Sequence, residues 1–186
     1  MDENPRAAYA LAMALVRILI DGYNLLHAWQ RFQESGDASS GGSRHRWPVL
    51  SPGQPRHSEA ARDQLIRHLA HYQNAVGTPV TVFFDGAGRR GPARPHDSSH
   101  AVEVLFSGNG QTADQMIERA AHRFTAWGEV LAVTDDVAER DTVIALGGFA
   151  SSCRQFIQQV NDTLGEQAAD IRHHNLRERN RYHRTR

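Results

Sequence analysis

The feature that most constrains the fold is an apolar run that ends abruptly in a carboxylate. Ile18, Leu19 and Ile20 are followed at once by Asp21-Gly22. A short apolar run bounded by a turn signal predicts a buried strand. In an open α/β sheet, ligands bind just outside the carboxyl ends of the strands, so an aspartate there is placed for chemistry. Asp-Gly also makes ordinary turns, so this strand alone leaves both interpretations open.

The same ending recurs along the chain. The predicted strands span 17–20, 80–84, 101–106 and 130–134. The second ends in Asp85-Gly86 and the fourth runs into Asp135-Asp136, so three of the four strands end in aspartate. The third leads into a glycine-rich turn, after which Asp114 lies in the first turn of a helix. An acid there also suits the helix dipole, so the recurrence carries more weight than Asp114 alone.

Apolar residues at helical spacing predict the elements between these strands. The predicted helices span 25–32, 58–77, 113–127 and 151–164, with a weaker helix between 141 and 147. Alternating strands and helices predict an α/β fold with a doubly wound parallel sheet, whose strands all end at one edge. The acids expected to meet at that edge are Asp21, Asp85, Asp114 and Asp136.

A chain of 186 residues predicts one such domain with additions. The expected domain spans 16–164, with an N-terminal extension over 1–15 and a flexible Ser-, Gly- and Pro-rich insertion at about 34–57. A basic C-terminal tail is expected over 165–186, and its part over 171–186 has few apolar residues and is predicted to be a mobile arm. The sequence of the N-terminal extension and the first apolar run fits neither a signal peptide nor a membrane span. We therefore expect no membrane partner. Met1 and Met13 remain alternative starts.

Missing residue types exclude several kinds of chemistry. All 21 basic residues are arginine. Phosphate-loop ATPases and Schiff-base enzymes need a lysine, as do haloacid-dehalogenase-type phosphatases and response-regulator receivers, and we expect no nucleotide cofactor. The single cysteine, Cys153, excludes an internal disulfide and a cysteine-rich zinc site. A reducing cytoplasm is the expected location.

Acids gathered at one edge need a cation. Two carboxylates 4 Å apart repel each other by about 4 kcal/mol at an effective dielectric constant of about 20. Oxygen ligands without cysteine favour Mg²⁺ or Mn²⁺, as one ion or two. Asn24 can fix a carboxylate, a water or a phosphate oxygen without adding charge. Asp135 and Glu118 are additional candidate ligands.

Arginines supply candidate RNA contacts. Arg89, Arg90 and Arg94 lie in the loop after Asp85, where they are placed to hold phosphates. Weaker candidates are Arg44 and Arg46 in the insertion and Arg177, Arg179 and Arg181 in the tail. A solvated loop and a tail without function are the alternatives.

Four motifs, taken in order, resemble those of NYN-domain nucleases, in particular the YacP-like branch. They are Ile-Leu-Ile-Asp21-Gly22-Tyr23-Asn24, Val-Phe-Phe-Asp85-Gly86, Thr112-Ala113-Asp114 with Ile117-Glu118-Arg119, and Val133-Thr134-Asp135-Asp136. The similarity runs from about 16 to 162.

The resemblance implies a PIN-like fold, a three-layer α/β/α sandwich with a central, mostly parallel sheet, and a metal-dependent endoribonuclease. It places Asp21, Asn24, Asp85 and Asp114 on acidic-site positions. The Thr-small-Asp pattern of the last motif selects Asp136 over Asp135, and Glu139 matches a further acidic position. The branch includes a ribosome-associated endonuclease that cuts messenger RNA, which extends the expected partners from RNA to the ribosome.

Two other functions remain open from the sequence. One is a non-catalytic RNA- or ribosome-binding module with the same fold, although every family acid is present. The other is a phosphatase or another phosphoryl hydrolase that uses the same carboxylates.

Overall fold

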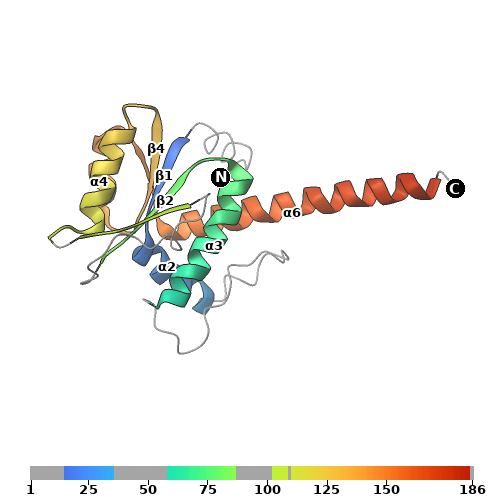
Figure 1. Ribbon diagram of the computed structural model, residues 1–186, viewed down its shortest axis with the longest axis horizontal. Helices are drawn as coiled ribbons and strands as arrows, with labels where there is room; N and C mark the ends of the chain where they lie inside the picture. Colours follow the sequence, from blue (N-terminus) through green and yellow to red (C-terminus); the bar gives the residue numbers. More distant parts are fainter. Residues whose placement is uncertain (1–14, 36–57, 87–101, 109, 185–186) are drawn as a thin grey trace.

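A computed structural model of the chain shows a five-stranded parallel sheet between two layers of helices (Figure 1). It describes residues 15–35, 58–86, 102–108 and 110–184. The strands are β1 (Leu15–Asp21), β2 (Val80–Phe84), β3 (Val102–Phe106), β4 (Glu129–Val133) and β5 (Phe149–Ser151). The helices are α2 (Gly22–Glu34), α3 (Glu59–Val76), α4 (Ala113–Phe124), α5 (Val137–Ala145) and α6 (Cys153–Arg184).

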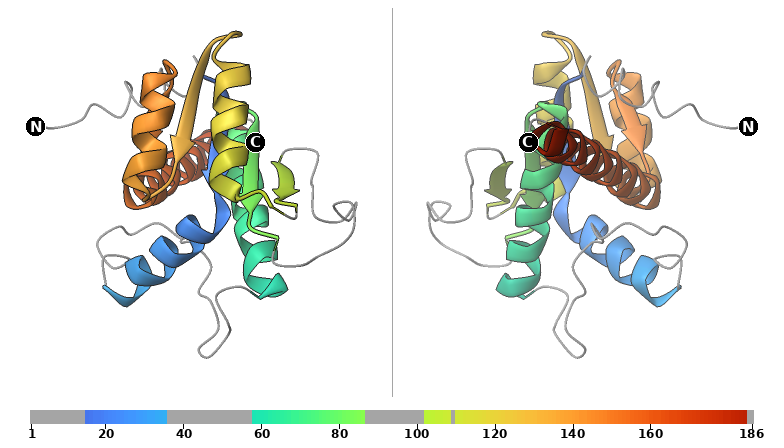
Figure 2. Two further views of the ribbon diagram at one scale, coloured as in Figure 1. Left: turned by 90° about the vertical axis from the view of Figure 1, so that its left-hand side faces the viewer. Right: turned by 90° about the vertical axis from the view of Figure 1, so that its right-hand side faces the viewer.

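The two faces of the sheet carry separate cores. Ile18 and Ile20 of β1 point into the larger core, which α2, α3 and α6 cover. Leu19, between them, points into a smaller core under α4 and α5, as alternation along a strand requires. Figure 2 shows α4 and α5 (yellow and orange) on one side and α2 and α3 (blue and green) on the other. The predicted three-layer α/β/α sandwich is therefore confirmed.

The order of the strands reverses direction at one position in the sheet. The order is β3-β2-β1-β4-β5. From β1 the chain moves outward to β2 and β3, and it then returns to the other side of β1 to form β4 and β5. In sheets with such a reversal, ligands bind outside the carboxyl ends of the strands on either side of it, here β1 and β4, and we call this position the crevice. Asp21 ends β1 and Thr134 follows β4, so both lie at this crevice.

Local capping explains several of the predicted boundaries. Ser58 caps the start of α3, and Gly77 ends it in the left-handed conformation with φ of 77°. Thr112 and Gln115 form a capping box at the start of α4. The predicted helices over 58–77 and at Ala113 are therefore confirmed.

Four elements differ from the expectation. One is α5, which begins at Val137, whereas the weaker helix was expected between 141 and 147. α2 begins at Gly22 instead of residue 25, because Asp21 caps it. The short strand β5 (Phe149–Ser151) was not predicted; it pairs with β4 in a region without strand-like alternation. The tail expected to be a mobile arm continues α6 as a helix to Arg184.

Two further findings concern the other expected additions. The described residues leave out most of the expected N-terminal extension, with the alternative start at Met13, and most of the expected insertion. Among the described helices, none is both long and apolar enough to cross a bilayer.

Candidate active site

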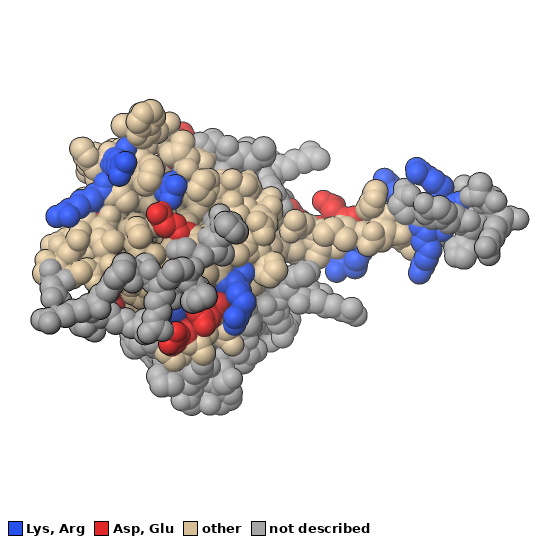
Figure 3. All heavy atoms as spheres, in the orientation of Figure 1, with Lys and Arg blue, Asp and Glu red and all other residues tan. Residues whose placement is uncertain are grey.

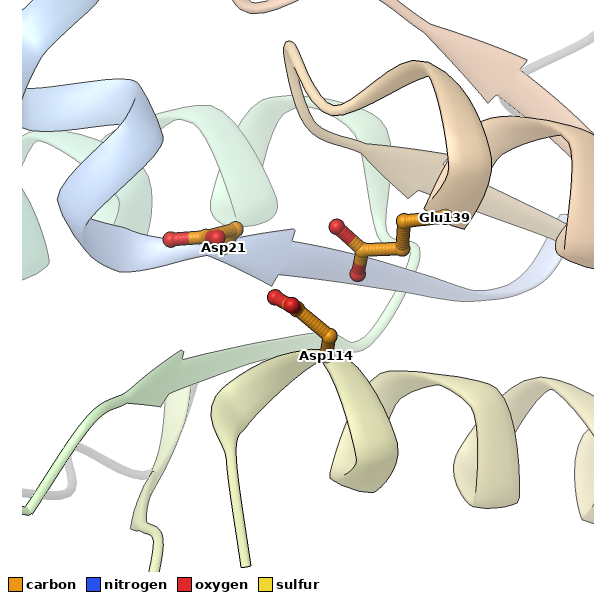
Figure 4. Close-up of side chains that lie close together, drawn as sticks. All are labelled: Asp21, Asp114 and Glu139. Carbon is orange, nitrogen blue, oxygen red and sulfur yellow. The ribbon is translucent and has the colours of Figure 1, made fainter.

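Three carboxylates from three different elements converge at the crevice. They belong to Asp21 at the end of β1, Asp114 in α4 and Glu139 in α5 (Figure 4). One oxygen from each lies within 4.8 Å of the other two. Asp21 and Glu139 are buried, and Asp114 is half-buried. This group is hereafter the acidic triad.

Asp21 is held in place by the helix that it caps. Its Oδ1 accepts a hydrogen bond from the backbone N–H of Asn24 over 2.9 Å, and its Oδ2 accepts one from the Asn24 side chain over 2.6 Å. Burial raises the pKa of Asp21, and the hydrogen bonds from Asn24 oppose that rise. Asn24 thus orients a carboxylate, one of the roles expected from its sequence position. A Cβ at Gly22 would overlap the ring of Phe84, which explains the glycine after Asp21.

Asp114 enters the acidic triad from the first turn of α4. The capping box formed by Thr112 and Gln115 fixes where this helix begins, and so fixes the position of Asp114. Burial raises the pKa of Asp114, and the negative charges of Asp21, Asp85 and Asp136 raise it further. The charges of three strand-end acids, Asp21, Asp85 and Asp136, therefore act on Asp114. Asp135 is not among them.

Glu139 is the least solvated member of the acidic triad. It is 2% exposed, and neither carboxylate oxygen has a hydrogen-bond partner among the described residues. Burial raises its pKa to about 8; the Thr134 hydroxyl opposes the rise, while Asp21, Asp114 and Asp136 add to it. A buried carboxylate in such a setting demands a proton or a cation.

Only a weak signal in the sequence indicated this position of Glu139. Asp136 caps α5 and Glu139 follows three residues later, which is the spacing of a capping box. In the structure the backbone N–H of Asp136 donates instead to Thr134 Oγ1 over 3.1 Å. The Glu139 side chain therefore does not complete a capping box and lies in the acidic triad instead.

Asp85 and Asp136 lie at the exposed rim of the site and organise its helices. Asp85 Oδ1 accepts from the backbone N–H of Ala113 over 2.7 Å and from Ser107 Oγ over 3.3 Å. Asp136 Oδ1 accepts from the backbone N–H groups of Ala138 and Glu139. Both acids are exposed, and all the hydrogen bonds that described side chains and backbone groups make to these two carboxylates use Oδ1.

The two additional candidate ligands lie outside the acidic triad. Asp135 Oδ1 accepts from the backbone N–H of Cys153 at the start of α6, and its Oδ2 pairs with Arg31 over 3.0 Å. Asp135 therefore joins β4, α6 and α2. Glu118 is half-buried on α4, one turn beyond Asp114.

The predicted RNA-binding arginines divide into two groups. Arg44, Arg46, Arg89, Arg90 and Arg94 lie outside the described residues. Arg177, Arg179 and Arg181 are exposed on the distal part of α6.

The chemistry of the acidic triad fits a divalent cation. It offers carboxylate oxygens only, the ligand type that hard cations prefer. The two Glu139 oxygens are buried and accept no close hydrogen bond from a described residue, although the nearby Thr134 hydroxyl favours their ionised form, so a cation would supply the missing counter-charge. Asp21, Asp114 and Glu139 are the residues that would hold it.

Comparisons with known proteins agree with this architecture. The uncharacterized protein YacP of Bacillus subtilis (strain 168) is 29% identical over 144 residues, covering 77% of this chain and 74% of that protein. The crystal structure of Rae1 (YacP) from Bacillus subtilis matches with a TM-score of 0.58 at 25% identity, covering 89% of this chain and 83% of that one. Its W164L mutant matches with a TM-score of 0.59 at 26% identity, covering 86% and 82%.

The family assignment rests on a match over nearly the whole chain. The model of the YacP-like NYN domain matches residues 18–185, which include every member of the acidic triad. The NYN domain is a nuclease family. With the sheet, the crevice and the matched residues in agreement, the chain belongs to the YacP-like NYN domain family.

Proposed function

We propose that this protein is a divalent-metal-dependent endoribonuclease that hydrolyses RNA phosphodiester bonds. The observation that carries the proposal is the convergence of Asp21, Asp114 and Glu139 at the crevice between β1 and β4. The nuclease family and the buried, unpaired Glu139 carboxylate support it.

Each member of the acidic triad has a distinct part in this proposal. Asp21, oriented by Asn24, and Glu139 form the buried side of the metal site, and Asp114 closes it from α4. Mg²⁺ or Mn²⁺ bound there would polarise a phosphate oxygen and neutralise the charge that develops on it. Without a cation, the same carboxylates would repel an anionic substrate.

Asp85 and Asp136 are proposed to act at the rim. Their Oδ1 atoms are engaged with helix N-termini, and the Oδ2 atoms are proposed to accept hydrogen bonds from the attacking water or to hold a second ion. In the hydrolysis, the water oxygen bonds to phosphorus, one P–O bond to ribose breaks, and the leaving oxygen takes up a proton. Asn24 keeps its amide on Asp21 and so acts as a positioning residue.

Cleavage of labelled RNA by the purified full chain tests the proposal. Activity is expected with Mg²⁺ or Mn²⁺ and is expected to stop when EDTA is added. We expect Asp21→Asn, Asp114→Asn and Glu139→Gln each to lower the cleavage rate at least about 100-fold. Glu129→Gln is the matched control, since Glu129 is exposed at the opposite end of β4.

A second readout follows the metal itself. Mn²⁺ titrated into the wild type is expected to raise the melting temperature by mass action, and Glu139→Gln is expected to abolish most of that rise. Assays are repeated with added ribosomes, because the chain is also proposed to act on messenger RNA bound to them in the cytoplasm. Mn²⁺ binding without RNA cleavage in either assay would favour the non-catalytic RNA- or ribosome-binding module. Turnover of a small phosphate ester with intact RNA would indicate a phosphatase.

A further inference from the structure

Helix α6 extends far beyond the domain that it helps to form (Figure 1). Its 32 residues span about 48 Å at 1.5 Å per residue. Ala168 is the last buried residue of α6 among those whose burial is described, so about 24 Å of helix lies beyond it. We call residues 169–184 the arm.

Positive charge is concentrated at the end of the chain. Residues 171–186 hold six of the 21 basic residues but one of the 21 acidic residues. The rest of the chain therefore carries 15 basic and 20 acidic residues, and the net charge of zero conceals two regions of opposite sign. Cations near a helix C-terminus also stabilise its dipole, but that effect is confined to about the last turn. Arg172, Arg177 and Arg179 lie more than one helical turn before Arg184, where α6 ends.

The arginines of the arm occupy two opposite sides of the helix. At 100° per residue, Arg172 and Arg179 share one side, and Arg177 and Arg181 share the other. All four are exposed. Figure 3 shows blue side chains both above and below the arm. A single anionic surface would meet only one of these pairs, whereas two anionic strands with the helix between them would meet both.

The described side chains of the arm lack the features by which helices bind apolar partners. Ile171 and Leu176 are its exposed large apolar residues among those described, 54% and 45% exposed. They lie about 140° apart around the helix, so they form no stripe for a protein groove or a bilayer.

We infer that the arm is a second RNA-binding site, in which the helix lies between two phosphate strands of a folded RNA. This inference rests on the proposed function, which makes RNA the substrate. The start of α6 lies beside the crevice, since Asp135 holds the N–H of Cys153. Arg179 lies about 39 Å along the helix from Cys153, so an RNA that fills both sites must be longer than the few nucleotides at the acidic triad.

Binding measured without turnover tests the arm separately from the nuclease. Fluorescence anisotropy of the full chain is recorded in EDTA with a labelled RNA hairpin, over a salt series from 50 to 300 mM. Two paired variants remove one side each: Arg172→Gln with Arg179→Gln, and Arg177→Gln with Arg181→Gln. Each lost phosphate contact is expected to reduce the slope of log K against log salt by about 0.9, or by about 2 for a pair and 4 for both pairs.

The control variant changes two exposed arginines outside the arm. Arg67→Gln with Arg123→Gln is expected to leave the slope unchanged. Circular dichroism confirms that α6 remains helical, because glutamine forms helices about as well as arginine. Binding of a short single-stranded RNA is expected to change little in the arm variants.

Three results would overturn the inference. A slope that stays at the wild-type value in the variant lacking both pairs would exclude RNA binding by the arm. An effect from only one pair would place RNA on one side of the helix and refute the two-strand arrangement. Competition by polyglutamate as strong as that by the hairpin at equal charge would assign the arm to an acidic protein. None of these results depends on RNA cleavage, so failure of the arm inference and failure of the proposed nuclease activity are distinguishable.

Discussion

The side-chain amide of Asn24 and its backbone N–H together hold both oxygens of the buried Asp21 carboxylate. The amide nitrogen also lies 3.4 Å from Thr134 Oγ1, so it connects the ends of β1 and β4. These hydrogen bonds lower the pKa of Asp21 against the effect of burial. One uncharged residue thus orients the carboxylate and favours its ionised form.

Replacing this amide should weaken the metal site more than the fold. Asn24→Ala removes the side-chain hydrogen bond and leaves the helix cap from the backbone N–H intact. We expect Mn²⁺ affinity to fall about 10- to 100-fold, as for other groups that orient a metal ligand. Titration followed by electron paramagnetic resonance measures it. Glu34→Ala at the exposed end of α2 is the control, and equal affinities in the two variants would refute the role of Asn24.

Glu139 should make the metal-free protein less stable as the pH rises. Its pKa is about 8 in the folded state, against an ordinary value of 4.5. Between those values the folded state binds the proton more tightly than the unfolded state, so stability is highest below about pH 4.5 and is lost as the pH rises through 8. The loss amounts to a few kcal/mol, at about 1.36 kcal/mol per pKa unit.

Urea unfolding in EDTA at pH 5, 6, 7 and 8 measures that loss. Glu139→Gln should flatten the decline, because glutamine does not titrate. Asp21 and Asp114, whose pKa values are also raised, leave a smaller slope of the same sign. A variant that loses stability with pH as steeply as the wild type would contradict the assignment.

Gly22 should tolerate no side chain, although its backbone needs no special conformation. A Cβ there would overlap the Phe84 ring, which stacks on Phe106 with centroids 5.6 Å apart. We expect Gly22→Ala to lower the free energy of unfolding by about 1 to 3 kcal/mol through overpacking. Gly108→Ala is the matched control, since no atom lies within 4 Å of a Cβ at that position. Equal unfolding midpoints for both variants would show that Phe84 moves aside freely.

The features that the sequence predicted are those with local causes. The apolar runs before Asp21, Asp85 and Asp135 are short, continuous and bounded by turn residues, and each became a parallel strand. Ser58 and Thr112 are strong caps, so α3 and α4 begin where expected. The convergence of Asp21 with Asp114 followed from the rule that parallel strands end at one edge.

The remaining features depend on tertiary contacts. A capping box and a buried, uncapping carboxylate share the spacing of Asp136 and Glu139, and burial alone distinguishes them. β5 has three residues, too few for a pattern, and forms by pairing with β4. The arm has no apolar periodicity; it is a helix because it extends one that is already nucleated and packed up to Ala168.

We expect the neighbouring acids to have different roles, Asp135 a structural one and Asp136 a functional one. Asp135 joins α6 to Arg31 of α2 and makes no contribution to the acidic triad. We expect Asp135→Ala to lower the free energy of unfolding by about 1 to 2 kcal/mol, through loss of the bond to Cys153, with Mn²⁺ affinity unchanged. Asp136→Ala should cost about 1 kcal/mol as a lost cap of α5 and should also weaken Mn²⁺ binding, because its charge acts on Asp114 and Glu139. Denaturation and metal titration of both variants decide the matter, and weaker Mn²⁺ binding by a fully folded Asp135→Ala would move the ligand to Asp135.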